Sequence, residues 1–366
     1  MTYSMKLWSE ILQIISGKKQ TAVEDPNGPY PIYGSGGTIG FARDYLCEAG
    51  TTIIGRKGTI NNPIFVNERF WNVDTAFGLA PGDMLHPKYL YYFCVMFNFK
   101  ELDKSTTIPS LAKRDLLNIR MPVPPLPEQE RIVANIEELF SELDKAVETL
   151  RTTKQHLAMY RQAVLKEAFG KVTTHTPFGK IIDARLGKML DKKKNTGNYK
   201  KYLRNINVRW FSFDLSDLLE MRIEDGEIEK YSVSLNDLII CEGGEPGRCA
   251  VWDKQDSLFY QKALHRVRFL DNSNPKFYMY YLWFFAQAGQ LCRYFTGTGI
   301  KHLTGQLLSK VIVPTADRTI QDSIVAEIES RLSVCDSIEK TVDTALQQAE
   351  ALRQSILKKA FEGGLA

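Results

Sequence analysis

A stretch of sequence that occurs twice constrains the fold of this 366-residue chain more than any other feature. Residues 129–169 read QERIVANIEELFSELDKAVETLRTTKQHLAMYRQAVLKEAF, and residues 321–361 read QDSIVAEIESRLSVCDSIEKTVDTALQQAEALRQSILKKAF, with 17 of 41 positions identical and no gap. Isolated matches at the same offset extend upstream, such as Pro122 with Pro314. A duplication of this kind predicts two copies of a larger unit, in the order globule, helix, globule, helix.

Apolar and small residues recur in each copy at alternating steps of four and three, which is the seam of a coiled coil. At about 1.5 Å per residue, such a helix is roughly 60 Å long, too long to bury its apolar stripe against one small domain. We therefore predict that the two helices pair with each other; the alternative is that each packs on its own domain. The predicted pairing residues are Ile132, Ile136, Leu139, Leu143, Leu150, Leu157 and Val164 in the first copy, and Ile324, Ile328, Ile338, Val342, Leu352 and Ile356 in the second, where Arg331 interrupts the seam.

The repeat divides the chain into four predicted segments, which are a globular domain (1–127), a long helix (128–170), a second globular domain (171–315) and a second long helix (316–366). Both globules mix strand-like runs with one or two helices, so the predicted fold class is α+β. Counting Lys and Arg against Asp and Glu gives the four segments net charges of +2, −2, +7 and −3. Positive globules and negative helices favour a polyanion on the globules and protein partners on the helices.

Two loops that follow predicted strands are candidates for nucleic-acid contact. Residues 55–58 read Gly-Arg-Lys-Gly after a strand that ends at Ile54, and the Gly-rich residues 242–248 follow a strand that ends at Ile240. Glycine lets a backbone approach a duplex closely, while arginine and lysine contact phosphates or guanine edges. An ordinary strand-connecting turn with solvated charges explains the same residues equally well.

Further candidates lie just before each repeated helix and at the start of the second globule. Residues 104–107 and 296–302 carry small hydroxyl and basic side chains, which suit phosphate contact and also suit an ordinary surface loop. A lysine-rich run precedes residues 202–210, where basic, amide and aromatic side chains alternate. The predicted DNA-binding residues are Tyr33, Ser35, Arg56, Lys57, Lys104, Thr106, Lys188, Lys192, Lys193, Lys194, Arg204, Asn207, Arg209, Arg248, Lys301 and His302.

The sequence carries no signature of a self-contained enzyme. It lacks a Gly-x-x-x-x-Gly-Lys-Ser/Thr phosphate loop, and its five histidines lack metal-ligand spacing. Its six cysteines form no Cys-x-x-Cys pair, which favours reduced thiols. No signal peptide is visible and no apolar run approaches about 18 residues, so we expect a cytoplasmic protein without membrane contact. We assign no catalytic residue and no metal site.

The segment Met121-Pro-Val-Pro-Pro-Leu-Pro-Glu-Gln-Glu-Arg-Ile-Val133, which runs into a long helix, resembles the central conserved region of the specificity (S) subunits of Type I restriction–modification systems. Tyr30-Pro-Ile-Tyr33-Gly-Ser-Gly-Gly37 and Tyr202-Leu-Arg-Asn-Ile-Asn-Val208 are similar to stretches of their target recognition domains. The chain departs from the family pattern at its second lead-in, Val313-Pro-Thr-Ala-Asp-Arg-Thr-Ile-Gln321, which lacks Pro-Leu-Pro-Glu-Gln.

The resemblance implies a non-catalytic reader of double-stranded DNA. Each target recognition domain would bind one half of a bipartite target, and the two helices would pair antiparallel, related by a pseudo-two-fold axis, as a spacer. Two modification subunits that use S-adenosylmethionine would dock against the helices, and restriction subunits that use ATP and Mg would join them, while the chain itself would bind no cofactor. The alternatives are a coiled-coil protein scaffold that does not read DNA, or a self-contained DNA methyltransferase or nuclease.

Overall fold

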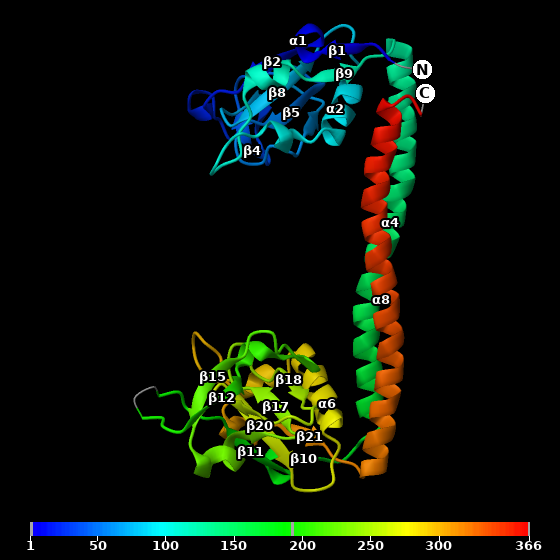
Figure 1. Ribbon diagram of the computed structural model, residues 1–366. Helices are drawn as coiled ribbons and strands as arrows, with labels where there is room; N and C mark the ends of the chain where they lie inside the picture. The colour runs from blue at the N-terminus through cyan, green and yellow to red at the C-terminus, as the bar shows by residue number, and fades with distance from the viewer. Residues whose placement is uncertain (1–2, 192–193, 365–366) are drawn as a thin grey trace. The chain divides into compact units, whose positions relative to one another are not determined.

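The computed structural model describes residues 3–191 and 194–364 and divides into two compact units. Unit 1 comprises Met1–Arg151 with Asp343–Ala366, and unit 2 comprises Thr152–Val342. Each unit contains one domain and a part of both long helices, α4 (Leu126–Gly170) and α8 (Arg318–Phe361) (Figure 1). Both domains mix strands with helices, which confirms the predicted α+β class.

The domain of unit 1 is built on a four-stranded antiparallel sheet. The sheet has the order β2-β8-β5-β6, and a smaller sheet has the order β4-β3-β7, in which β3 and β7 run parallel. A short pair, β1 with β9, leads directly into α4. The bounds are β1 Met5–Leu7, α1 Trp8–Ile11, β2 Leu12–Ser16, β3 Tyr30–Gly34, β4 Gly37–Ala42, β5 Thr51–Gly55, β6 Ile64–Val66, β7 Trp71–Asn72, β8 Ala76–Pro81, α2 Pro87–Met96, α3 Lys113–Leu117 and β9 Arg120–Pro122.

The domain of unit 2 repeats this topology. Its main sheet has the order β11-β20-β17-β18, its second sheet the order β15-β12-β19-β16 with β12 and β19 parallel, and β10 pairs with β21 before α8. A hairpin, β13 with β14, is added between β12 and β15. The bounds are β10 His175–Pro177, β11 Ile182–Leu186, β12 Asn198–Leu203, β13 Val208–Arg209, β14 Ser212–Phe213, β15 Leu219–Ile223, α5 Ile228–Tyr231, β16 Ser232–Val233, β17 Leu238–Cys241, β18 Cys249–Val251, β19 Leu258–Tyr260, β20 Leu264–Phe269, α6 Pro275–Gln287, α7 Gly305–Leu308 and β21 Ile312–Pro314.

A phenylalanine at the end of each long helix packs against the main helix of a domain. In unit 1 the ring of Phe361 lies 4.9 Å from that of Tyr89 and 5.4 Å from that of Phe93, both on α2. In unit 2 the ring of Phe169 lies within 5.3 Å of two aromatic rings of α6. These rings belong to Phe277 and Tyr281, which lie 188 residues after Tyr89 and Phe93. The duplication therefore extends to tertiary contacts.

The two long helices pair antiparallel, as predicted. In unit 2, Nη2 of Arg161 on α4 donates to Asp336 and Glu339 on α8, both at 2.7 Å, and Arg331 of α8 donates to Glu167 of α4 at 2.9 Å. Residue numbers thus rise along one helix as they fall along the other. Unit 1 repeats the first of these ion pairs, between Arg353 and Asp144. These two residues are the repeat equivalents of Arg161 and Asp336, at an offset of 192.

Most of the predicted seam is buried, but three of its residues are exposed. Leu139, Ile338 and Leu352 keep 40%, 41% and 51% of their surface accessible, so the prediction was wrong for them. The buried residues of the predicted seam are Ile132, Ile136, Leu157, Val164, Ile324, Ile328, Val342 and Ile356, and Leu143 and Leu150 are partly buried.

One position near the start of each helix is displaced by one residue, because this part of the helix also packs against its domain. After Ile136 the seam takes a second step of four to Phe140, whose ring lies 5.8 Å from that of Tyr92 on α2. Leu332 is the repeat equivalent of Phe140 and is buried in the same way. The shift places Leu332 in the seam instead of Arg331, which removes the interruption seen in the sequence.

A buried glutamine fixes the start of α4. Gln129 is fully buried, and its Oε1 accepts a hydrogen bond from the backbone N of His86 at 2.8 Å. Its Nε2 donates to the backbone oxygens of Met84 and Pro124, at 2.9 and 2.8 Å. One amide thereby joins the lead-in, the helix and the segment before α2.

Gln321 does the same at the start of α8. Its Oε1 accepts from the backbone N of Asn274 at 2.6 Å, and its Nε2 donates to the backbone oxygen of Ala316 at 2.8 Å. Because Gln321 is the repeat equivalent of Gln129, this contact is kept even though residues 313–321 lack the Pro-Leu-Pro-Glu sequence of the first lead-in.

We expect Gln129→Ala and Gln321→Ala each to lower the free energy of unfolding by about 2 kcal/mol, because each leaves buried backbone groups without partners. Urea unfolding followed by circular dichroism measures the change. Gln348→Ala is the matched control, because Gln348 is an exposed residue of α8 and its loss should change stability by less than about 0.5 kcal/mol. Equal effects at all three positions would contradict the assigned role.

The position of the seam can be tested on neighbouring residues. Phe140→Ala should cost about 3 kcal/mol of unfolding free energy, since it empties a buried aromatic site. Leu139→Ala, one residue earlier on the exposed side, should cost less than about 1 kcal/mol. If Leu139→Ala lost more unfolding free energy than Phe140→Ala in the same urea titration, the seam predicted from the sequence would be the correct one.

Candidate nucleic-acid interface

Backbone hydrogen bonds bring two predicted contact segments of unit 1 together. The oxygen of Arg56, in the loop after β5, accepts from the backbone N of Leu111 at 2.9 Å. The N of Gly58 donates to the oxygen of Pro109, also at 2.9 Å. Gly58 has a φ of +80°, a conformation that favours glycine. The loop after β5 and the segment that precedes α3 thus form one edge of the domain.

The basic side chains of this edge differ in their exposure and in the ion pairs that they form. Arg56 is half-buried, with its guanidinium carbon 5.7 Å from the centre of the Phe77 ring. Lys57 is exposed, and none of the ion pairs found in the described part of the chain involves it. Lys104 donates to Asp115 at 2.8 Å, a hydrogen bond that lowers the pKa of the Asp115 carboxyl. Lys57 is therefore the cation of this edge that is free to contact an anionic partner, and the exposed Thr106 lies in the same segment as Lys104.

The loop after β3 borders the same edge. The backbone oxygen of Tyr33 accepts from Val73 at 3.0 Å, and Thr75, two residues later, accepts from Arg56 at 2.8 Å. The half-buried ring of Tyr33 packs edge-on against that of Phe70, 5.5 Å away. The side chain of Ser35, also half-buried, follows in the turn.

Unit 2 uses the same backbone framework with different side chains. The N of Glu242 donates to Ala263 at 2.9 Å, and its oxygen accepts from Leu303 at 2.7 Å. Gly244 has a φ of +79°. By these contacts Glu242 occupies the place that Arg56 has in unit 1, and Gly244 the place of Gly58. One loop geometry therefore presents a cationic pair in one domain and a carboxylate in the other.

Three segments meet around Arg248 in unit 2. Its Nη2 donates to the backbone oxygen of Asn205 at 2.9 Å, and its Nη1 to Glu245 at 2.6 Å. The other carboxylate oxygen of Glu245 accepts from Nε1 of Trp210 at 3.0 Å. Arg248 is only 14% exposed, so it holds these loops together. Asn205 and Glu245 were absent from the predicted contact set, although the alternation of amides and aromatics in residues 202–210 pointed to this region.

Two other predicted residues shape the loop between β12 and β15. Arg204 donates to Asp217 at 2.6 Å and is 19% exposed. Asn207 is buried and donates to the backbone oxygens of Asp214 and Asp217, both at 3.0 Å. Arg209 is 51% exposed and lies 3.6 Å from Asp214, so its guanidinium faces solvent on one side.

The first lysine of the predicted basic run is not a surface cation. The side chain of Lys188 is 6% exposed and forms ion pairs with Glu224 and Glu227. Burial lowers the pKa of Lys188, but the hydrogen bonds to both carboxylates outweigh it, and the pKa lies above its ordinary value. The same contact holds the pKa of Glu224 far below its usual range. Two carboxylates already balance this cation, so it is not placed to meet phosphate.

The remaining predicted residues are dispersed. Lys194 is exposed, whereas Lys192 and Lys193 lie outside the described residues. Lys301 is exposed and donates to the oxygen of Gly297 at 2.7 Å. The half-buried His302 pairs through its backbone with Gly243, so its segment lies beside the loop after β17.

Within residues 3–191 and 194–364, no three His, Cys, Asp or Glu side chains are grouped to hold a metal ion. In the same residues, no helix is long and apolar enough to cross a membrane. All six cysteines are free, and burial raises the pKa of Cys47 to about 12 and that of Cys241 to about 11. Such thiols are poor nucleophiles near neutral pH.

Known proteins share this architecture. A search of solved structures finds one from a study of complex assembly and conformational transition of the type I R-M system, with a TM-score of 0.81 and 15% identity over 99% of this chain and 98% of that one. The HsdS subunit from Thermoanaerobacter tengcongensis aligns with a TM-score of 0.61 and 16% identity over 99% and 97%. At these identities the likeness establishes the fold.

Sequence comparison finds similarity to one kind of protein. The Type I restriction modification DNA specificity domain matches residues 3–155. The EcoKI specificity subunit of Escherichia coli K12 is 29% identical over 275 residues, which cover 69% of this chain but only 59% of that protein. The EcoBI specificity subunit of Escherichia coli is 24% identical over 86% of this chain and 73% of that protein. The domain match and these relatives show that the chain is similar to the specificity subunits of Type I restriction–modification systems.

Proposed function

We propose that this chain is the DNA-reading subunit of a Type I restriction–modification complex, and that each domain binds one half of a bipartite double-stranded target. The observation that carries the proposal is the loop framework that both domains share and that each furnishes with different side chains. A common backbone geometry sets a common distance to the duplex, while different side chains select different bases.

The charges support a duplex as the partner of the domains. Residues 171–315 carry a net charge of +7, and the edge of unit 1 presents the free ammonium of Lys57. Counterion release by such cations gives the sequence-independent part of the affinity. Base edges are then read by the side chains of the loops after β5 and β17. A coiled-coil scaffold without DNA readout has no use for this duplicated edge.

The partners and cofactors follow from the same proposal. Two modification subunits dock against the long helices, whose segments 128–170 and 316–366 carry net charges of −2 and −3. Those subunits bind S-adenosylmethionine and methylate adenine, and restriction subunits contribute ATP-driven translocation and cleavage with Mg. This chain supplies target selection and the spacing of the two half-sites, and no catalytic group.

Lys57→Ala should weaken DNA binding several-fold and reduce the slope of log affinity against log salt by about 0.9, the value for one phosphate contact. Fluorescence anisotropy with a duplex that contains the methylation target measures both quantities in the complete methyltransferase complex. Lys166→Ala, at an exposed position of α4, removes the same charge from a helix and should change neither. An unchanged slope for Lys57→Ala would remove this residue from the interface.

Exchanging residues 171–315 for the second domain of another specificity subunit should change one half-site of the target and leave the other intact. The physical reason is that each domain has its own core and its own copy of the edge. Mapping methylated adenines in a host that carries the exchanged chain measures the outcome. A change in both half-sites would contradict one domain reading one half.

A further inference from the structure

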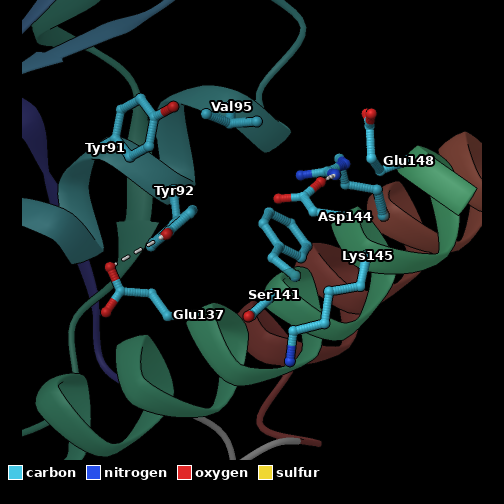
Figure 2. Close-up of a pocket in the computed structure, with 10 residues that line it drawn as sticks. Tyr91, Tyr92, Val95, Glu137, Ser141, Asp144, Lys145 and Glu148 are labelled. Atoms are coloured by element: carbon cyan, nitrogen blue, oxygen red, sulfur yellow. Dashed lines mark hydrogen bonds and ion pairs between the residues drawn. The ribbon is translucent and has the colours of Figure 1, made fainter.

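Unit 1 contains a groove of about 950 Å³ between α2, α4 and α8. Tyr91, Tyr92 and Val95 of α2 line one wall, and α4 contributes the opposite wall (Figure 2). The ring of Phe140 lies in the groove, with the guanidinium carbon of Arg353 4.5 Å from its centre. The groove therefore combines aromatic and aliphatic surface with polar groups at its edge.

Most of the charges of the groove are already compensated. Glu137 accepts from Lys88 at 2.5 Å and from the Tyr92 hydroxyl at 3.4 Å, a contact drawn in Figure 2. Asp144 forms an ion pair with Arg353. In contrast, Glu148 is exposed and takes part in none of the ion pairs found in the described part of the chain. One carboxylate at the rim is thus left for an external cation.

The duplication shows what occupies the equivalent place in unit 2. Tyr280 and Trp283 of α6 lie 188 residues after Tyr92 and Val95. The ring of Phe211 lies 5.3 Å from that of Tyr280 and 4.8 Å from that of Trp283, edge-on to the latter. In unit 2 the chain therefore places an aromatic side chain of its own against this surface.

Phe211 reaches that position through a hairpin that unit 1 lacks. It lies at the turn between β13 and β14 with a φ of +69°, and its backbone N donates to the oxygen of Cys249 at 3.2 Å. The residues just before it are Arg209 and Trp210. At the corresponding point of unit 1, only Ser35 and Gly36 separate β3 from β4. Unit 1 therefore has the equivalent surface on α2, but not the hairpin that covers this surface in unit 2.

We propose that the groove of unit 1 binds an aromatic side chain of a modification subunit, and that a Lys or Arg beside this side chain pairs with Glu148. The inference rests on the proposed function and adds the docking surface to it. An aromatic ring buried among Tyr91, Tyr92 and Val95 gains apolar contact and edge-on ring geometry, as Phe211 does. The free carboxylate of Glu148 at the rim disfavours a phosphate backbone and favours a cationic segment of a protein as the occupant.

Binding of the modification subunit of the same system to the full chain, measured by titration calorimetry, tests the proposal. Val95→Asn replaces an apolar side chain of the groove wall by a polar amide, and should raise the Kd about tenfold, equivalent to roughly 1.4 kcal/mol. Glu148→Lys should raise it by a smaller factor that shrinks at high salt. Glu138→Lys makes the same charge change at another exposed position of α4, away from the groove, and should leave the Kd unchanged.

A crosslinking experiment identifies the occupant directly. With the photoreactive p-benzoylphenylalanine in place of Val95, irradiation of the assembled complex on DNA should join the chain to an aromatic, Lys- or Arg-containing segment of the modification subunit. Crosslinks to DNA, to a second copy of the chain or to nothing would overturn the proposal. If the modification subunit fails to bind even the unaltered chain, the proposed function fails; if it binds all variants equally, only the groove assignment fails.

Discussion

The antiparallel pairing of α4 and α8 is the constraint on which the other contacts depend. Neither helix can bury its stripe alone, and antiparallel pairing brings the start of one helix beside the end of the other. Each domain is consequently held at two points by two helices: unit 1 by Gln129 of α4 and Phe361 of α8, and unit 2 by Gln321 of α8 and Phe169 of α4. A duplicated chain thereby builds two equivalent junctions from the same kinds of contact.

Most of this architecture could be predicted because the two copies of the repeat are recognisable in the amino-acid sequence. The exact seam could not, since Leu139 and Phe140 are both apolar and a period of about 3.5 residues accommodates either. The choice was made by α2, where Tyr92 packs against Phe140. Helix periodicity contains no information about a neighbouring domain. In α8 the same displacement places Leu332 at the buried position instead of Arg331, so the arginine does not interrupt the apolar stripe.

For the candidate nucleic-acid interface, the sequence predicted the segments but not the state of their side chains. Sequence composition located the segments, and the fold brought the loops after β5 and β17 beside the segments that precede α3 and α7. Sequence composition did not reveal which basic side chains are free of ion pairs. Lys188 and Arg204 are held by carboxylates of residues 13 or more positions away in the chain, at Glu224, Glu227 and Asp217. A local pattern of basic residues cannot register such partners, so charge density overstates the cations available to DNA.

The two copies share the backbone framework of the interface and differ in the side chains that it carries. The left-handed glycines Gly58 and Gly244 and their surrounding backbone hydrogen bonds are common to both, whereas Glu242 takes the place in unit 2 that Arg56 has in unit 1. Under the proposed function, an arginine would pair with a guanine edge and a carboxylate would accept from a cytosine amino group, so this exchange would change base preference without moving the loop. The same division applies to α2 and α6, which present equivalent surfaces: in unit 2 Phe211 covers that surface, and in unit 1 the surface lines an open groove. Under the proposed function, a change that is tolerated at a DNA edge alters the target, while a change at the helix surface alters how a partner subunit docks.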